Sequence, residues 1–135
     1  MDNWQVGQVV DNLDWVADDL APMLAAAMPI GGGTGFAREA GAAGETAVRA
    51  SRNIGPKIRI LVNGRIRYPD GLLADELNEV KNVLRIARTR QLRDYLSFSQ
   101  QTGRTFVLWL RRNARLSRPL QAEIEAGRII PKEIP

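Results

Sequence analysis

The apolar run Thr105–Leu110 constrains the fold of this chain more than any other stretch of the sequence. Its side chains do not alternate between apolar and polar, which is typical of a strand that is buried on both faces of a sheet. Before it lies an amphipathic segment, residues 89–101, in which Leu92 and Leu96 share one stripe, and Gly103 follows as a helix-ending residue. A helix that leads into such a strand predicts an α/β fold, with a mixed β-sheet flanked by helices.

The residues upstream predict the rest of the sheet. Apolar and polar side chains alternate over residues 57–62, which is typical of a strand. Asn63 and Gly64 come next, a pair that favours a two-residue hairpin turn because both positions of that turn need a positive φ. The chain is then expected to return as a strand over 65–68, and a third strand is predicted over 77–83.

Helices are expected on both sides of this group of strands. Residues 36–51 are rich in alanine and glycine, which suits close packing against a sheet, and Thr34 is the expected N-cap. Downstream, Ser117 is expected to cap a short helix over 119–126, and a final edge strand is predicted over 128–130.

The N-terminal part differs from the rest in charge. The first 35 residues hold five aspartates and no lysine or arginine, whereas the remainder holds all 19 basic residues and 10 acidic ones, a net charge of +9. We expect residues 1–34 to form a leader, with an amphipathic helix over 1–20 and a glycine linker over 31–35, and residues 35–135 to form the main domain. The apolar stretch 20–30 is too short to cross a bilayer, so no membrane span is predicted.

The sequence contains no cysteine and no histidine. Disulfides, thiolate zinc sites and catalytic sites that depend on histidine are therefore excluded. Proton transfer has to rely on carboxylates, lysine, tyrosine or a metal-activated water. The positive charge of the main domain, most of it from arginine, indicates a polyanionic partner such as nucleic acid.

Two carboxylates and a lysine are expected to meet in the middle of the chain. Because side chains alternate along a strand, Glu79 and Lys81 should project from the same face of the third strand. Asp70 follows a proline at the predicted end of the second strand, from where it could lie beside Glu79. Paired carboxylates suit Mg²⁺ or Mn²⁺, and a lysine beside them can hold an attacking water. A turn is the alternative role for Asp70, since Pro-Asp-Gly is a common turn sequence, and Asp75 and Glu76 are assigned to a solvated loop.

These residues carry a resemblance to known nucleases. The proline and Asp70, followed by Glu79-x-Lys81, resemble the PD-(D/E)xK motif of restriction-endonuclease-fold nucleases. Gln91 and Tyr95, which lie four residues apart and share a helix face, resemble the QxxxY motif of the RecB-like branch. The surrounding sequence is similar to the toxin domains at the C-termini of bacterial polymorphic toxins, of the Rhs and contact-dependent inhibition types.

The similarity covers roughly residues 39–135, and it implies a restriction-endonuclease-like core with a metal-dependent nuclease activity. DNA is the substrate that it favours, with a tRNA-cleaving RNase or a non-catalytic nucleic-acid-binding module as alternatives. Catalysis would then rest on Asp70, Glu79, Lys81, Gln91 and Tyr95. The ligands of Mg²⁺ (or Mn²⁺) would be Asp70, Glu79, the Val80 carbonyl and Glu45. An ordinary exposed glutamate remains the alternative for Glu45, and packing at the margin of the core remains the alternative for Gln91 and Tyr95.

The resemblance also implies partners. Four arginines near the predicted site are expected to grip the nucleic-acid backbone: Arg85, Arg88, Arg90 and Arg93. A toxin domain of this type is expected to be part of a larger carrier polypeptide or to use a secretion machinery, and to be neutralised by a cognate immunity protein. It would be a secreted effector that acts in the cytoplasm of the target cell.

Overall fold

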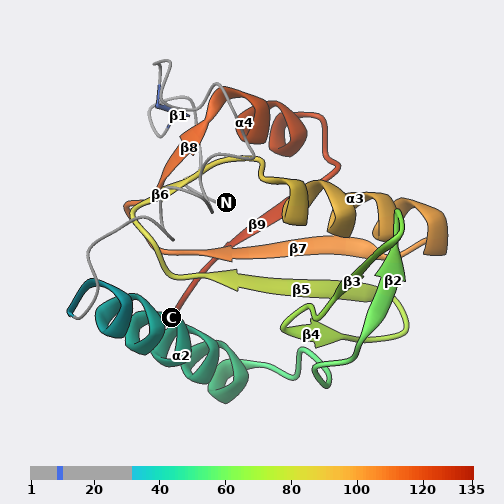
Figure 1. Cartoon of the computed structure of the whole chain (residues 1–135). Helices are drawn as coiled ribbons and strands as arrows, with labels where there is room; N and C mark the ends of the chain where they lie inside the picture. The colour runs from blue at the N-terminus through green and yellow to red at the C-terminus, as the bar shows by residue number, and fades with distance from the viewer. Residues whose placement is uncertain (1–8, 11–31) are drawn as a thin grey trace.

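The structure of the protein, a computed structural model, describes residues 9–10 and 32–135 (Figure 1). Its elements are β1 (Val9–Val10), α2 (Gly32–Ser51), β2 (Ile60–Val62), β3 (Arg65–Arg67), β4 (Gly71–Leu72), β5 (Glu76–Lys81), β6 (Arg85–Ile86), α3 (Arg90–Thr102), β7 (Thr105–Leu110), β8 (Arg115–Ser117), α4 (Arg118–Glu125) and β9 (Ile130–Glu133). In the described part of the chain, no helix combines the length and the apolar character that a membrane crossing requires.

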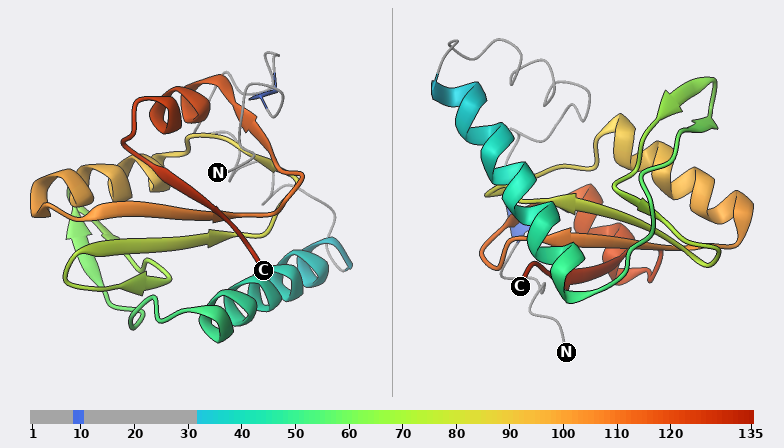
Figure 2. Two further views of the ribbon diagram at one scale, coloured as in Figure 1. Left: turned by 180° about the vertical axis from the view of Figure 1, so that it is seen from behind. Right: turned by 90° about the horizontal axis from the view of Figure 1, so that it is seen from below.

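The central sheet has the strand order β4-β5-β7-β9. β4 is antiparallel to β5, whereas β5, β7 and β9 run parallel to one another. Helix α3 connects β5 to β7, and it lies with α4 over one face of the sheet while α2 lies over the other (Figures 1 and 2). The predicted α/β fold, with a mixed sheet flanked by helices, is therefore confirmed.

Strand β7 is buried on both faces, as its apolar sequence predicts. Phe106, Leu108 and Leu110 belong to a core cluster that includes side chains of α3 and α4. Val107 and Trp109 point to the other face and belong to a second cluster that includes α2. The two clusters hold the helices on opposite sides of the sheet.

Strands β2 and β3 form a hairpin that is separate from the central sheet and packs against α3 (Figure 1). Its turn is the predicted one, with φ of 53° at Asn63 and 74° at Gly64. The helix caps at Gly103 and Ser117 are also as predicted: Gly103 has φ of 70°, and the Ser117 hydroxyl accepts a hydrogen bond from the backbone N–H of Leu120.

Several short strands were not predicted, because two or three residues show no readable periodicity. These are β4, β6 and β8. The final strand is Ile130–Glu133 rather than 128–130, and it includes Pro131, which an edge strand can tolerate. The assignment of Glu76 to a solvated loop was wrong: Glu76 begins β5, and its carboxylate lies 2.6 Å from Arg52 Nη2.

The N-terminal predictions are tested only in part. Helix α2 begins at Gly32 rather than at residue 36, so Thr34 lies inside it and is not its N-cap. Val9 and Val10 form a strand parallel to β8, and the helix predicted over residues 1–20 is therefore wrong at these two β-branched residues. The rest of that helix lies outside the described residues. The boundary between leader and main domain stays a prediction.

Candidate active site

The structure brings Asp70, Glu79 and Lys81 together at one edge of β5. Glu79 and Lys81 share a face of the strand, and Glu79 Oε2 lies 3.3 Å from Lys81 Nζ. Asp70 lies in the loop before β4 rather than at the end of β3, which stops at Arg67. The backbone N–H of Asp70 donates to Glu79 Oε1 at 3.1 Å, and Asp70 Oδ2 accepts from the Val80 N–H at 2.8 Å. Asp70 is thus fixed to the open edge of β5 by two hydrogen bonds.

Close backbone packing sets the position of the loop that carries Asp70. A Cβ atom on Gly71 would lie 2.2 Å from the carbonyl oxygen of Ile54, so only glycine fits there. Arg49 at the end of α2 donates to the carbonyl of Gly55 at 2.8 Å and also to the carbonyl of Asp70. The loop is therefore held against the segment that follows α2.

Glu79 is buried, with 4% of its surface exposed. Burial raises the pKa of its carboxyl to about 7; the Lys81 ammonium opposes this change and the Asp70 carboxylate adds to it. Glu79 and Asp70 thus lie close enough for their charges to interact, and each forms an ion pair with a lysine, Glu79 with Lys81 and Asp70 with Lys57. Two neighbouring carboxylates are ligands that a divalent cation can use.

A second lysine, Lys57, lies at the site, and no sequence motif indicated its role. Lys57 Nζ lies 3.2 Å from Asp70 Oδ1 and 3.1 Å from Glu45 Oε1. Partial burial opposes its charge, but these two carboxylates raise the pKa of Lys57 above its ordinary value. Glu45 also pairs with Arg49, at 3.1 Å. The structure therefore places Glu45 beside Asp70, with Lys57 between them.

Gln91 and Tyr95 project from α3 toward the same group. Lys81 Nζ donates to Gln91 Oε1 at 2.8 Å. The side chain of Tyr95 is fully buried with its ring edge-on to Phe106, and its hydroxyl has no hydrogen-bond partner among the described residues. Burial raises the pKa of Tyr95, and the charges of Glu79 and Asp70 raise it further. The hydroxyl is therefore a neutral donor with an unfilled hydrogen-bonding position near the two carboxylates.

Residues 41–120 match the family model described as restriction endonuclease fold toxin 7. The chain belongs to this family. The matched region contains every side chain of the cluster described above. No curated protein and no solved structure matches the chain. Membership confirms the restriction-endonuclease fold and identifies a toxin of the nuclease type.

The donor set of this restriction endonuclease fold toxin fits a divalent metal of the Mg²⁺ class. Within the described residues, no group of three or more histidine, cysteine or acidic side chains is arranged to hold a metal ion. Mg²⁺ does not need such a group, because it is usually bound by one or two carboxylates, together with water and substrate phosphates. Asp70 and Glu79 are two carboxylates that the structure brings together in this way.

The four arginines predicted to grip nucleic acid lie on two neighbouring elements of the toxin and the segment between them. Arg85 is exposed on β6, and Arg90 is exposed at the first residue of α3. Arg93 is half-buried on α3. Arg88 is half-buried, and its guanidinium lies 3.0 Å from the Glu123 carboxylate of α4. Their contact with nucleic acid stays a prediction, and Arg88 has a structural role in addition.

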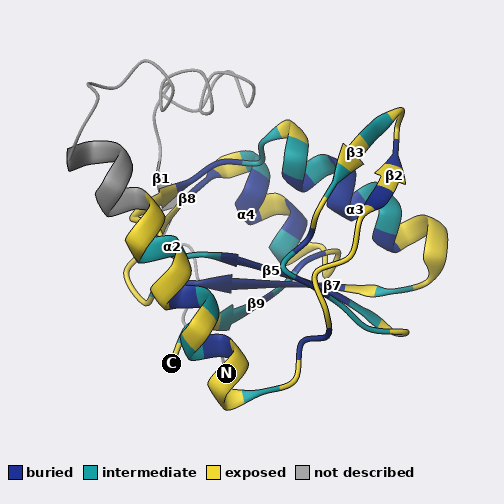
Figure 3. Cartoon of the chain, turned by 60° about the horizontal axis from the view of Figure 1, so that its bottom comes forward, coloured by how far each residue is buried: buried dark blue, intermediate teal, exposed yellow. Residues whose placement is uncertain are grey.

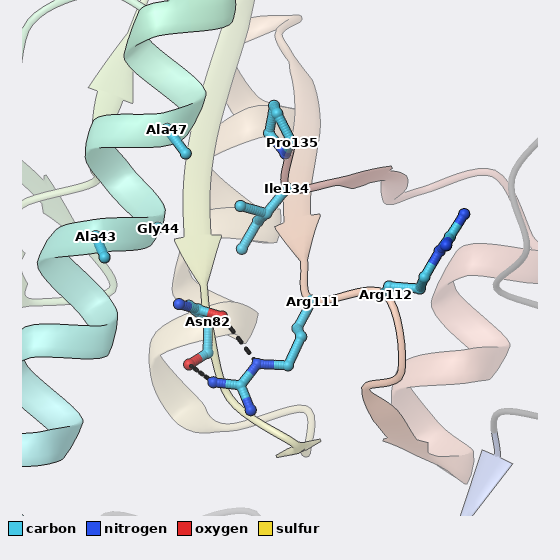
Figure 4. A pocket seen from close by; sticks show the side chains of 8 residues that line it. All are labelled: Ala43, Gly44, Ala47, Asn82, Arg111, Arg112, Ile134 and Pro135. Atoms are coloured by element: carbon cyan, nitrogen blue, oxygen red, sulfur yellow. Dashed lines mark hydrogen bonds between the residues drawn. The ribbon is translucent and has the colours of Figure 1, made fainter.

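A cavity of about 330 Å³ lies between α2 and the ends of β5 and β7 (Figure 4). Asn82, the residue after Lys81, lines it, accepts from Arg111 Nε at 2.9 Å and donates to the carbonyl of Ala40 at 2.7 Å. A Cβ on Gly44 would lie 2.8 Å from the Asn82 Cβ. The polar groups of Asn82 therefore tie α2 to the end of β5.

Proposed function

We propose that this toxin is a metal-dependent endonuclease that hydrolyses phosphodiester bonds of DNA. The observation that carries the proposal is the convergence of Asp70, Glu79 and Lys81 at one strand edge, inside the region that matches the toxin family. A buried pair of carboxylates beside a lysine fits phosphodiester hydrolysis, because the reaction develops negative charge and needs an activated water.

Asp70 and Glu79 would hold one or two Mg²⁺ or Mn²⁺ ions, with the Val80 carbonyl as a further ligand. The Val80 N–H points to Asp70. The N–H and C=O of one strand residue point to the same side of the strand, which supports this role for the carbonyl. Glu45 stays a proposed ligand, although its carboxylate pairs with Lys57 and Arg49. The metal would supply a Lewis acid for the phosphate and would acidify a water molecule.

The other residues of the cluster would act on the phosphate and on the attacking water. The Lys81 ammonium would stabilise the charge that develops on the phosphate, and Gln91, which accepts a hydrogen bond from it, would fix its position. The Tyr95 hydroxyl would donate to a phosphate oxygen or to the water. Arg85, Arg90 and Arg93 would hold the backbone without reading sequence, together with Arg88.

In its biological setting, the protein would be a secreted effector that enters the cytoplasm of competitor bacteria, carried by a larger polypeptide or a secretion machinery. A cognate immunity protein would neutralise it in the producing cell. Membership of the toxin family supports this setting.

Incubation of the purified protein with plasmid DNA and, separately, with total RNA tests the proposal. Each substrate is assayed with Mg²⁺, with Mn²⁺ and with EDTA, and a Glu79→Gln variant serves as the control for contaminating nucleases. We expect cleavage of DNA that requires the metal and is absent in the variant. If the protein cleaves RNA and not DNA, the substrate is RNA. Full activity in excess EDTA would overturn the metal mechanism.

A further inference from the structure

The exposed large hydrophobic side chains of the described residues are concentrated at the hairpin β2–β3. Four of the six lie in or next to it: Ile58, Leu61, Ile66 and Tyr68, with exposed fractions of 42%, 67%, 48% and 57%. Soluble proteins rarely place several large apolar side chains on one small surface unless that surface binds something.

The register of the hairpin separates this surface from the core. Ile60 and Val62 are buried, and their cross-strand partners Arg67 and Arg65 face the same way, toward α3. Leu61 and Ile66 are paired with each other and are both exposed, and Figure 3 shows exposed positions on both strands of the hairpin. Tyr68 follows Ile66 at the next outward position of the chain. The outer face of the hairpin, formed by Leu61, Ile66 and Tyr68, is thus apolar and aromatic.

The chemistry of the segment favours an anionic occupant. Residues 57–69 contain four basic residues and no acidic one. Lys57, Arg65 and Arg67 form ion pairs with acidic residues outside this segment, and Arg59 is exposed two residues before Leu61. A second copy of the chain would bring like charges together, which opposes association. An exposed aromatic side chain together with arginine is a feature on which unstacked nucleic-acid bases bind.

The surface is also next to the candidate active site. The two strands of the hairpin lead directly into Lys57 on one side and Asp70 on the other, and these two residues form an ion pair. Tyr68 is only two residues before Asp70, a distance along the chain of at most about 7 Å, and Ile66 is four residues before it, at most about 14 Å. A nucleic acid with its scissile phosphate at Asp70 would therefore reach this surface within a few nucleotides.

We propose that the outer face of the hairpin binds unstacked bases beside the scissile bond, so that the toxin prefers nucleic acid with a single-stranded or opened segment at that place. The proposal rests on the nuclease function proposed above. Tyr68 would stack on one base, while Leu61 and Ile66 would cover the face of its neighbour.

Fluorescence anisotropy with full-length protein tests the proposal. All proteins carry Glu79→Gln to prevent cleavage, and the probes are a short single-stranded DNA and the corresponding duplex at one salt concentration. Tyr68→Ala and Leu61→Ser alter the outer face. Leu84→Ser is the matched control, because Leu84 is 58% exposed and lies beside Arg85 but outside the hairpin. Thermal melting followed by circular dichroism establishes that each variant is folded.

We expect Tyr68→Ala to bind the single strand about tenfold more weakly than the parent, which is the usual effect of losing one base-stacking aromatic side chain. Leu61→Ser should also bind the single strand more weakly than the parent. The affinity of the hairpin variants for the duplex should equal that of the parent. Leu84→Ser should bind both probes as tightly as the parent. Equal single-strand affinity of parent and hairpin variants would overturn the proposal, as would an equal loss of duplex binding. A change in self-association alone would instead identify a second copy as the occupant and also overturn it. If the parent protein binds neither probe, the proposed nuclease function fails, whatever the hairpin does.

Discussion

Lys57 forms an ion pair with Asp70, with 3.2 Å between Nζ and Oδ1, and it holds the Glu45 carboxylate at 3.1 Å on its other side. The aspartate of the candidate active site is therefore oriented by a lysine that belongs to no recognised motif.

Lys57→Ala should lower cleavage by roughly 10- to 100-fold, the usual cost of removing a group that orients a metal ligand. The loss has a physical cause, because the Asp70 side chain would keep only its hydrogen bond from the Val80 N–H. Initial rates of plasmid nicking measure the effect. Lys57→Arg keeps the positive charge and should recover part of the activity; an alanine variant with unchanged rates would contradict the positioning role.

Glu79→Gln should reduce cleavage about a thousandfold or more, because loss of one charged active-site group commonly costs several kcal/mol of barrier. The same variant should abolish killing when the protein is produced in bacteria. Asp75→Asn is the matched control, since Asp75 is an exposed acidic side chain just before β5. Killing by a folded Glu79→Gln protein would mean that the active site is elsewhere.

Tyr95→Phe separates structure from catalysis. The variant removes a buried hydroxyl that has no hydrogen-bond partner among the described residues, so the folded protein should be as stable as the parent or more stable. If the hydroxyl donates to the phosphate or the water, cleavage should still fall about tenfold or more. The melting temperature and the cleavage rate are measured on the same preparation. A stable variant with full activity would assign Tyr95 to the core alone.

Asp94→Asn should destabilise the protein by about 3 kcal/mol, the low end for removing the carboxylate of a buried ion pair, because Arg65 is partly exposed. Asp94 is 1% exposed on α3; it accepts from Arg65 at 2.7 and 2.8 Å and from Arg67 at 2.8 Å. Burial opposes ionisation, but hydrogen bonds from Arg65, Asn63 and Arg67 hold the pKa of Asp94 well below its ordinary value.

The same interaction makes a prediction about pH. A carboxyl whose pKa is lowered by folding stabilises the protein above its unfolded pKa, which is about 3.9, and this stabilisation is lost as the pH falls toward the folded pKa. Urea unfolding measures the free energy of unfolding of the parent and of Asp94→Asn. The difference between the two proteins should be constant between pH 5 and 7 and should become smaller below about pH 4. If the difference in the free energy of unfolding stays the same below about pH 4, the ion pairs of Asp94 are not its source.

Local patterns predicted the part of the site that lies on single elements. Strand alternation placed Glu79 and Lys81 on one face, and helical spacing placed Gln91 and Tyr95 on another, and the structure has both arrangements. The catalytic roles assigned to these residues stay predictions.

The links between distant elements could not be read from the sequence. Lys57 meets Glu45 across 12 residues, and nothing in the sequence around either indicates the other. In the sequence, Asp94 is typical of an exposed helical residue. In the structure, it binds two arginines of a hairpin that lies 27 to 29 residues upstream. Such contacts depend on how the elements pack, and packing has no local signal.

The close approach of Gly71 to Ile54 has a consequence for experiments with this protein. A side chain at position 71 would collide with backbone, so Gly71→Ala would move the neighbouring Asp70 away from Glu79. The net charge of +4 and every ionisable group would be kept. The variant and the parent toxin therefore carry the same charge. If the variant binds a polyanion or an acidic protein more weakly than the parent, the loss cannot be attributed to a lost or added charge.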